Sequence, residues 1–315
     1  MKQLIFFGSD RYSAIVLTHL LEHRNTGKLE NFVVITDRPK PVGKDKSIAT
    51  NPVEKLAIER NIKVSYYPSN DNEMNNLVAE LSKQASESNQ VYGLCASFDH
   101  LVPASIIDTF GGNLYNLHPS LLPQYRNVSP VQYALALGDL QTGITLFRIS
   151  TGIDNGEIVG QVAEPIEQGD DTPSLTSRLF EKGAGLFLDF LQNSEININK
   201  DSNLVSGKQI FTRRLTRDSG YLEWDVFQSL LKNAKIDPSM ITNHLISLRL
   251  QHNPGGNMMS DLLRALSPWP GVWTNAKTKK GDLRITLDSL DPVKIKIAGK
   301  PNPISYDDFK KYYLI

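Results

Sequence analysis

A short apolar segment near the middle of the chain carries an asparagine and a histidine that can act on one group. Residues 113–118 read Asn-Leu-Tyr-Asn-Leu-His, and strand alternation places Asn116 and His118 on the same face. The Asn116 amide can donate to a carbonyl oxygen, and the His118 imidazole can exchange a proton near neutral pH. The pair suits chemistry at a carbonyl carbon, although an isolated Asn-x-His can also simply end a strand.

Two loops that follow this pair in the sequence carry residues that could take part in the same chemistry. Residues 119–126 hold Leu121 and Leu122 between two prolines that stiffen the turn, so the leucines either fill the core or wall a pocket. Residues 151–156 read Thr-Gly-Ile-Asp-Asn-Gly, and Asp154 in this turn can orient an imidazole and keep it protonated. Taken alone, such a loop is more often a plain turn with a solvated aspartate.

The elements that must position these residues follow from the alternation of short apolar runs with helical patterns, which predicts parallel strands and crossover helices. The predicted strands are residues 4–7, 32–35, 64–67, 91–96, 113–118, 144–149 and 157–163, and the predicted helices are residues 14–21, 53–58, 73–81 and 174–191. We expect an α/β fold with a doubly wound, mostly parallel, Rossmann-like sheet. Ligands of such sheets bind outside the carboxyl ends of the strands.

The chain divides into three predicted parts: a catalytic domain (residues 1–192), a polar linker (193–207) and a smaller C-terminal domain (208–315). Residues 223–250 have a helical period with a break at Pro238, and residues 283–297 alternate like short strands.

The overall composition limits the partners. The 34 basic residues balance 34 acidic ones, so any attraction for nucleic acid must be local. The single cysteine, Cys95, can form neither an internal disulfide nor a cysteine-rich metal site, which suits a reducing cytoplasm. No run approaches the roughly 20 apolar residues of a transmembrane helix. We expect a cytoplasmic monomer without membrane contact.

Together the motifs resemble the folate-dependent formyltransferases. That family's Asn-x-His, Ser-Leu-Leu-Pro-x-x-Arg and Gly-x-Asp-x-Gly elements correspond, in order and spacing, to residues 116–118, 120–126 and 152–156. The resemblance begins near residue 7, continues to about residue 191, and resumes at residues 215–225 and 267–271. Each piece alone is common, whereas the combination is specific.

The resemblance implies transfer of a formyl group from 10-formyltetrahydrofolate, used as a substrate, to an amine. Asn116, His118 and Asp154 would be catalytic, and no metal would be needed. The residues expected to bind the folate are Ala96, Phe98, Leu101, Val102, Ser120, Leu121, Leu122, Pro123, Gly152 and Ile153.

The basic segment 37–46 resembles the family's tRNA-contacting insertion, which implies initiator methionyl-tRNA as the acceptor. The residues expected to bind tRNA are Arg38, Lys40, Lys44, Lys46 and Arg126. Two positions depart from the family pattern. Asn127 replaces the usual glycine, so an asparagine must adopt that turn, and Lys44 replaces the usual arginine, which keeps the charge but loses the bidentate fork.

The C-terminal domain resembles the family's tRNA-binding barrel only at its start. Too few residues follow Trp273 for a complete five-stranded barrel, and residues 226–250 look inserted. We therefore expect a reduced, OB-like β-barrel domain with a helical insertion.

Three other readings remain open. An N-formyltransferase acting on a nucleotide-linked amino sugar would share the catalytic half, although the Trp-Pro-Gly element at residues 269–271 and the basic segment favour tRNA. A formyltetrahydrofolate hydrolase would usually carry an N-terminal regulatory domain. A non-catalytic RNA-binding relative would not be expected to retain all three catalytic residues.

Overall fold

The computed structural model describes residues 2–23, 29, 31–42, 47–87, 90–192, 209–279 and 281–314. These residues group into two compact units. The N-terminal unit consists of Met1–Arg126, Gly143–Glu164 and Thr176–Ile210, and the C-terminal unit consists of Asn127–Thr142, Pro165–Leu175 and Phe211–Ile315. The segment 193–207, predicted to be a linker, lies outside the described residues.

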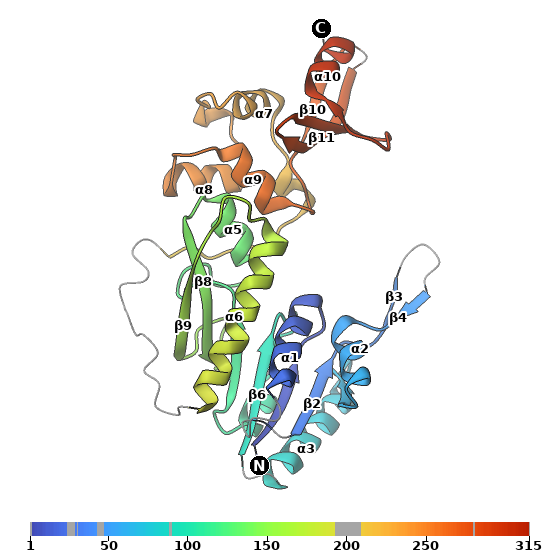
Figure 1. Cartoon of the computed structure of the whole chain (residues 1–315), viewed down its shortest axis with the longest axis vertical. Helices are drawn as coiled ribbons and strands as arrows, with labels where there is room; N and C mark the ends of the chain where they lie inside the picture. The colour runs from blue at the N-terminus through green and yellow to red at the C-terminus, as the bar shows by residue number, and fades with distance from the viewer. Residues whose placement is uncertain are drawn as a thin grey trace. The chain divides into compact units, whose positions relative to one another are not determined.

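The N-terminal unit is built on a seven-stranded sheet of order β5-β2-β1-β6-β7-β8-β9 (Figure 1). The strands are β1 (Lys2–Phe7), β2 (Asn31–Thr36), β5 (Lys63–Tyr66), β6 (Gln90–Ala96), β7 (Leu114–His118), β8 (Gln141–Arg148) and β9 (Ile158–Pro165). The pairs from β5 to β7 are parallel and the pair β7–β8 is antiparallel. The predicted mostly parallel α/β sheet is confirmed.

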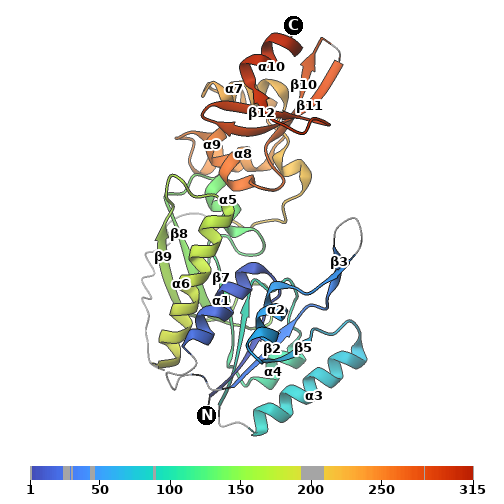
Figure 2. The same cartoon turned by 45° about the vertical axis from the view of Figure 1, so that its right-hand side comes forward.

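Helices cover both faces of this sheet, which explains why its central strands are apolar without alternation. The helices of this unit are α1 (Arg11–Glu22), α2 (Pro52–Glu59), α3 (Asp71–Glu87), α4 (Ala104–Thr109) and most of α6 (Thr172–Gln192). Helix α1 packs beside α2, and α3 packs beside α4 (Figure 2). Leu77 and Leu81 of α3 share a buried cluster with Ile5, Ile35 and Leu114 of the strands.

The parallel strands bring their carboxyl ends to one edge of the sheet. The chain passes from β1 to β2 on one side and later enters β6 on the other, so a topological switch point lies between β1 and β6. At this point Asp10 caps α1, because its carboxylate accepts from the backbone N–H groups of Tyr12 and Ser13 at 2.9 and 2.8 Å.

The C-terminal unit combines helices with a small sheet. Its helices are α5 (Pro130–Ala136), α7 (Trp224–Leu231), α8 (His244–His252), α9 (Met258–Leu266) and α10 (Tyr306–Tyr313). Strands β10 (Trp273–Thr278), β11 (Gly281–Leu290), β12 (Val293–Ile297) and β13 (Ile304–Ser305) form an antiparallel sheet. The predicted combination of short strands and helices is confirmed, and a short 3-10 helix at Pro238–Met240 separates α7 from α8 as expected.

Several short elements escaped the sequence analysis. They are the helices α4, α5, α9 and α10, the strands β10 and β13, and the two-stranded sheet of β3 (Lys40–Val42) and β4 (Ser47–Ala49). Elements of this length have weak patterns of their own, and tertiary contacts decide their conformation. None of the described helices is long and apolar enough to cross a membrane.

A buried arginine joins the helices of the C-terminal unit. Arg249 of α8 is 1% exposed, pairs with Asp261 of α9 at 2.8 Å, and donates to the Gly255 carbonyl. Its guanidinium also passes Gly138, where a Cβ atom would lie 1.3 Å from Nη1 and where φ is +65°. Position 138 therefore has no room for a side chain.

Gly138→Ala should destabilise the protein by about 1–3 kcal/mol, because the added methyl overlaps the buried guanidinium. Denaturant unfolding, followed by circular dichroism, measures the change. Gly169→Ala is the matched control in the same unit, since no atom lies within 4 Å of the added carbon. Equal stability of the two variants would contradict the close approach of Arg249.

Candidate active site

Strand β7 presents the predicted catalytic asparagine and histidine on one face. Leu114, Asn116 and His118 alternate with buried residues of the opposite face, and Leu114 anchors the strand in the core. Asn116 lies opposite Phe147 of β8 in the antiparallel pairing. Within the described part of the chain no hydrogen bond reaches the Asn116 amide, so this donor is available to a ligand.

His118 is held between two acceptors. Its ring is buried, with the residue 5% exposed; Nε2 lies 2.9 Å from the carbonyl oxygen of Tyr125, and Nδ1 lies 3.5 Å from Oδ2 of Asp154. A carbonyl can only accept, so a neutral ring carries its proton on Nε2 and donates it to Tyr125. Nδ1 then presents its lone pair on the side of Asp154.

Burial and charge act in opposite directions on this imidazole. Burial lowers the pKa of His118 below its ordinary value, and nearby Arg126 lowers it further. The Asp154 carboxylate and the hydrogen bond to Tyr125 raise the pKa but do not outweigh burial. The resting ring is therefore neutral near pH 7, so the expectation that Asp154 keeps the imidazole protonated is wrong for the resting site, because burial outweighs the carboxylate. The carboxylate lies beside the ring once it is charged.

The turn that carries Asp154 depends on backbone conformations unusual for ordinary residues. Asp154 itself is left-handed with φ 44°, and Gly152 has φ 121°. A Cβ atom on Gly156 would lie 1.6 Å from the carbonyl oxygen of Arg148, so only glycine fits there. The two flanking glycines thus allow the turn that brings Asp154 to His118.

The loop after β7 is tied to β8 by hydrogen bonds. The Thr145 hydroxyl donates to the Ser120 carbonyl at 2.6 Å and accepts from the Leu122 N–H at 3.0 Å. Leu121 and Leu122 are 7% and 3% exposed and lie in the interior, while Pro123 is half-buried. Thr145 therefore fixes the loop that turns the Tyr125 carbonyl toward His118.

Sequence reasoning did not single out Thr145, Gln161 or Tyr125. The Gln161 amide donates to the Leu122 carbonyl and to Thr145, each at 2.9 Å, and Tyr125 is left-handed with φ 58°. Polar residues in β8 and β9 were a weak signal. A hydrogen bond from a histidine to a backbone carbonyl cannot be predicted from residue types, because every residue has that carbonyl.

The departure at Asn127 is accommodated as expected. Asn127 is left-handed with φ 82°, a conformation that asparagine tolerates better than most residues, and its side chain donates to the Thr212 carbonyl at 3.2 Å. Arg126, predicted to contact tRNA, lies near enough to His118 to lower its pKa electrostatically.

The residues predicted to bind the folate differ in how far they are buried. Ala96 is fully buried at the end of β6, Ser120 is fully buried, and Phe98 and Val102 pack on the core cluster. Leu101 is 78% exposed. Ile153 is 53% exposed, and the neighbouring Gly152 is also at the surface. Leu101 and Ile153 are thus the large apolar side chains of this set that are exposed to solvent.

Two of the residues predicted to contact tRNA, Arg38 and Lys40, lie at the start of β3. Arg38 is paired with Glu73 of α3 at 2.8 Å, and Lys40 is paired with Asp37 at 2.9 Å. Both cations are largely exposed, so a phosphate can compete for them. Lys44 and Lys46 lie outside the described residues.

Comparison with known proteins identifies the family of the chain. Residues 2–191 match the formyl transferase family. A methionyl-tRNA formyltransferase from Corynebacterium diphtheriae is 30% identical over 94% of this chain and 85% of its own length. One from Listeria welshimeri is 26% identical over 98% of this chain and 85% of its own.

A solved structure has a related fold over nearly the whole chain. It is an N-formyltransferase from Helicobacter canadensis in complex with folinic acid and dTDP-3-aminofucose, with a TM-score of 0.53 and 19% identity. The alignment covers 95% of this chain and 96% of that one. The sequence matches confirm the resemblance drawn from the three motifs, and the chain belongs to the formyl transferase family.

Proposed function

We propose that this formyl transferase moves a formyl group from 10-formyltetrahydrofolate to the amine of initiator methionyl-tRNA in the cytoplasm. The observation that carries the proposal is the extent of the sequence match. The C. diphtheriae methionyl-tRNA formyltransferase aligns with 94% of this chain, well beyond residue 191 where the match to the family ends. The C-terminal unit is therefore part of the sequence resemblance to methionyl-tRNA formyltransferases.

The roles of the three central residues follow from their contacts. The acceptor amine forms a bond to the formyl carbon, and Asn116 donates to the oxygen as it becomes negative. Neutral His118 takes a proton from the amine on Nδ1, and Asp154 stabilises the resulting imidazolium. The oxyanion then collapses, the bond to N10 of the folate breaks, and N10 takes the proton from the His118 imidazolium, which returns to its neutral form.

Two exposed apolar side chains support folate binding near the catalytic residues. Leu101 lies on the loop after β6, and Ile153 lies in the turn that carries Asp154. Covering two such side chains with a flat ring removes apolar surface from water. Leu101 follows β6 at the carboxyl edge of the parallel strands, whereas β8 runs antiparallel to β7 and the turn after it reaches His118 through Asp154. A donor that covers both side chains would therefore lie beside the catalytic residues.

Local charge supports an RNA acceptor. The chain has no net charge, so phosphate attraction must come from groups such as Arg38, Lys40 and Arg126, with Lys44 and Lys46 as further candidates. The first turn of α1 is less suited to a small phosphate ligand, because the Asp10 carboxylate already accepts its N–H groups. This arrangement argues against an acceptor anchored by phosphate at that helix.

Purified protein should formylate charged initiator tRNA and not amino-sugar nucleotides when supplied with radiolabelled 10-formyltetrahydrofolate. Acid-precipitable label measures transfer to tRNA, and chromatography measures transfer to the sugar. Uncharged initiator tRNA is the control that lacks the methionyl amine. Faster transfer to an amino-sugar nucleotide would replace the tRNA assignment with the sugar assignment.

Asn116→Ala and His118→Ala should each lower kcat by about a hundredfold to a thousandfold, because the lost contacts matter most as charge develops. Folinic acid affinity, measured by calorimetry, should change little. Asn113→Ala removes an amide before the same strand and serves as the matched control with nearly normal turnover. Near-normal kcat in either active-site variant would contradict its catalytic role.

Asp154→Asn should lower kcat by about tenfold to a hundredfold, the usual effect of removing a carboxylate that supports a functional histidine. Because the carboxylate raises the pKa of His118, its loss lowers that pKa further, and the acid limb of the pH–rate profile should move to lower pH. Asn155→Ala, in the same turn, should leave the limb in place. An unmoved limb in Asp154→Asn would show that the turn is only structural.

A further inference from the structure

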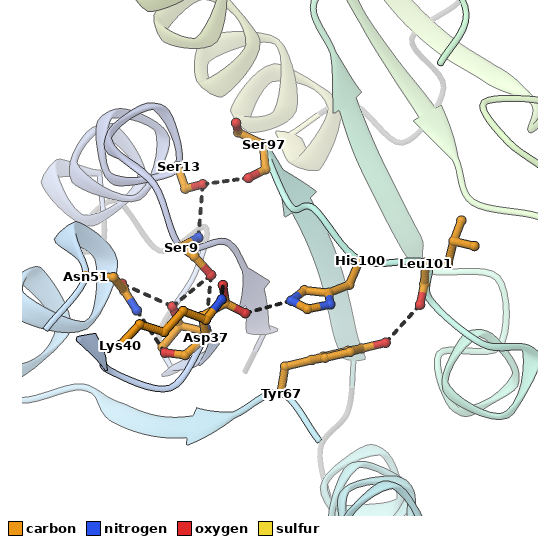
Figure 3. A network of polar contacts seen from close by, with 10 residues as sticks. Ser9, Ser13, Asp37, Lys40, Asn51, Tyr67, Ser97, His100 and Leu101 are labelled. Carbon is orange, nitrogen blue, oxygen red and sulfur yellow. Dashed lines mark hydrogen bonds and ion pairs between the residues drawn. The ribbon is translucent and has the colours of Figure 1, made fainter. Parts of the chain in front are cut away.

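A network of polar contacts lies at the carboxyl ends of β1, β2 and β6 (Figure 3). It shares no residue with the contacts of His118 to Tyr125 and Asp154. Its centre is Asp37, the residue that follows β2. One carboxylate oxygen accepts from Lys40 at 2.9 Å, and the other lies 2.6 Å from Nε2 of His100 on the loop after β6. One side chain thus joins two segments more than sixty residues apart.

The backbone of Asp37 is fixed from two sides. Its N–H donates to the Ser9 hydroxyl after β1 at 3.0 Å, and its carbonyl accepts from the Asn51 amide at 2.9 Å. Asn51 also caps α2 through the N–H of Glu54. Because Asp37 precedes β3 and Asn51 follows β4, both ends of the two-stranded sheet are attached to this network.

His100 is held on the other side by aromatic rings. Its ring stacks on Tyr67 at 4.4 Å and lies 4.9 Å from Phe98, and Phe98 contacts Phe7 of the core at 5.7 Å. The Tyr67 hydroxyl donates to the Leu101 carbonyl at 2.8 Å. The ring that meets Asp37 therefore packs against the same loop and, through Phe98, against the core.

The Asp37 carboxylate is ionised, which favours its contact with His100. Partial burial raises the pKa of Asp37, but the hydrogen bonds from Lys40 and His100 outweigh that effect, and the net direction is downward. The carboxylate is charged near neutral pH and is 24% exposed, while the His100 side chain is 35% exposed. Solvent screens this pair, so its contribution is modest and it can break and reform.

We propose that the His100–Asp37 contact couples folate binding to tRNA binding. The inference rests on the proposed function, in which the loop after β6 contacts the folate and the segment around β3 contacts tRNA. A folate that orders residues 98–101 holds His100 in place, and His100 then fixes Asp37 and Lys40 at the start of β3. Asp37 and His100 are positioning residues, and by linkage tRNA must strengthen folate binding equally.

The test measures initiator tRNA affinity with and without saturating folinic acid, and folinic acid affinity with and without tRNA. In the wild-type protein each ligand should tighten the other about fivefold, the lower end of typical coupling, since the linking pair is exposed. Asp37→Asn and His100→Ala should each bring the ratio to about one. The double variant should lose no more than either single variant.

Glu73→Gln is the matched control, because it breaks another exposed ion pair of the same segment, Arg38–Glu73, that does not involve the loop after β6. The fivefold ratio should survive in this variant. If His100→Ala weakens folinic acid binding itself, Asp37→Asn carries the test, since residue 37 lies outside the folate loop.

Two results would overturn the proposal while leaving the function intact: wild-type protein that binds the two ligands independently, or variants that keep the full ratio. Failure of the wild type to bind tRNA or folinic acid at all would instead overturn the proposed function. The two failures are distinguishable because each binding curve is recorded separately.

Discussion

The burial of the His118 imidazole between two oxygen acceptors is the interaction on which the rest of the site depends. A desolvated ring holds a proton less firmly than a free histidine, so its lowered pKa leaves the ring neutral and able to accept a proton near neutral pH. The same ring needs support once it is charged, and Asp154 lies on the side of its free nitrogen. Burial favours the neutral imidazole, which can accept a proton, and the Asp154 carboxylate stabilises the imidazolium that then forms.

This constraint explains the unusual backbone around the ring. Tyr125 must turn its carbonyl toward Nε2, and Asp154 must reach Nδ1, and both residues are left-handed. Such conformations cost roughly 1–3 kcal/mol each and persist only where the surroundings fix them. Thr145 and Gln161 provide that support for the first loop, and the close approach of Gly156 to Arg148 provides it for the second.

The amino-acid sequence by itself determined the strand alternation that puts Asn116 and His118 on one face, the parallel sheet, and the break at Pro238 between two helices. These features depend on local periodicity and on residue type, both of which are visible along the chain. The order of the three motifs was equally visible and led to the family. The requirement for an asparagine able to adopt a left-handed turn at residue 127 was also foreseen.

Only the tertiary structure decided which groups meet. That the Tyr125 carbonyl faces His118, that Thr145 fixes the neighbouring loop, and that Asp37 meets His100 all involve segments joined by the sheet rather than by sequence. Short helices such as α5 and α9 were missed for the same reason, because their stability comes from packing and not from propensity. The spacing of side chains predicts which residues share a face of one helix or strand. Burial and contacts between elements arise only when the chain folds.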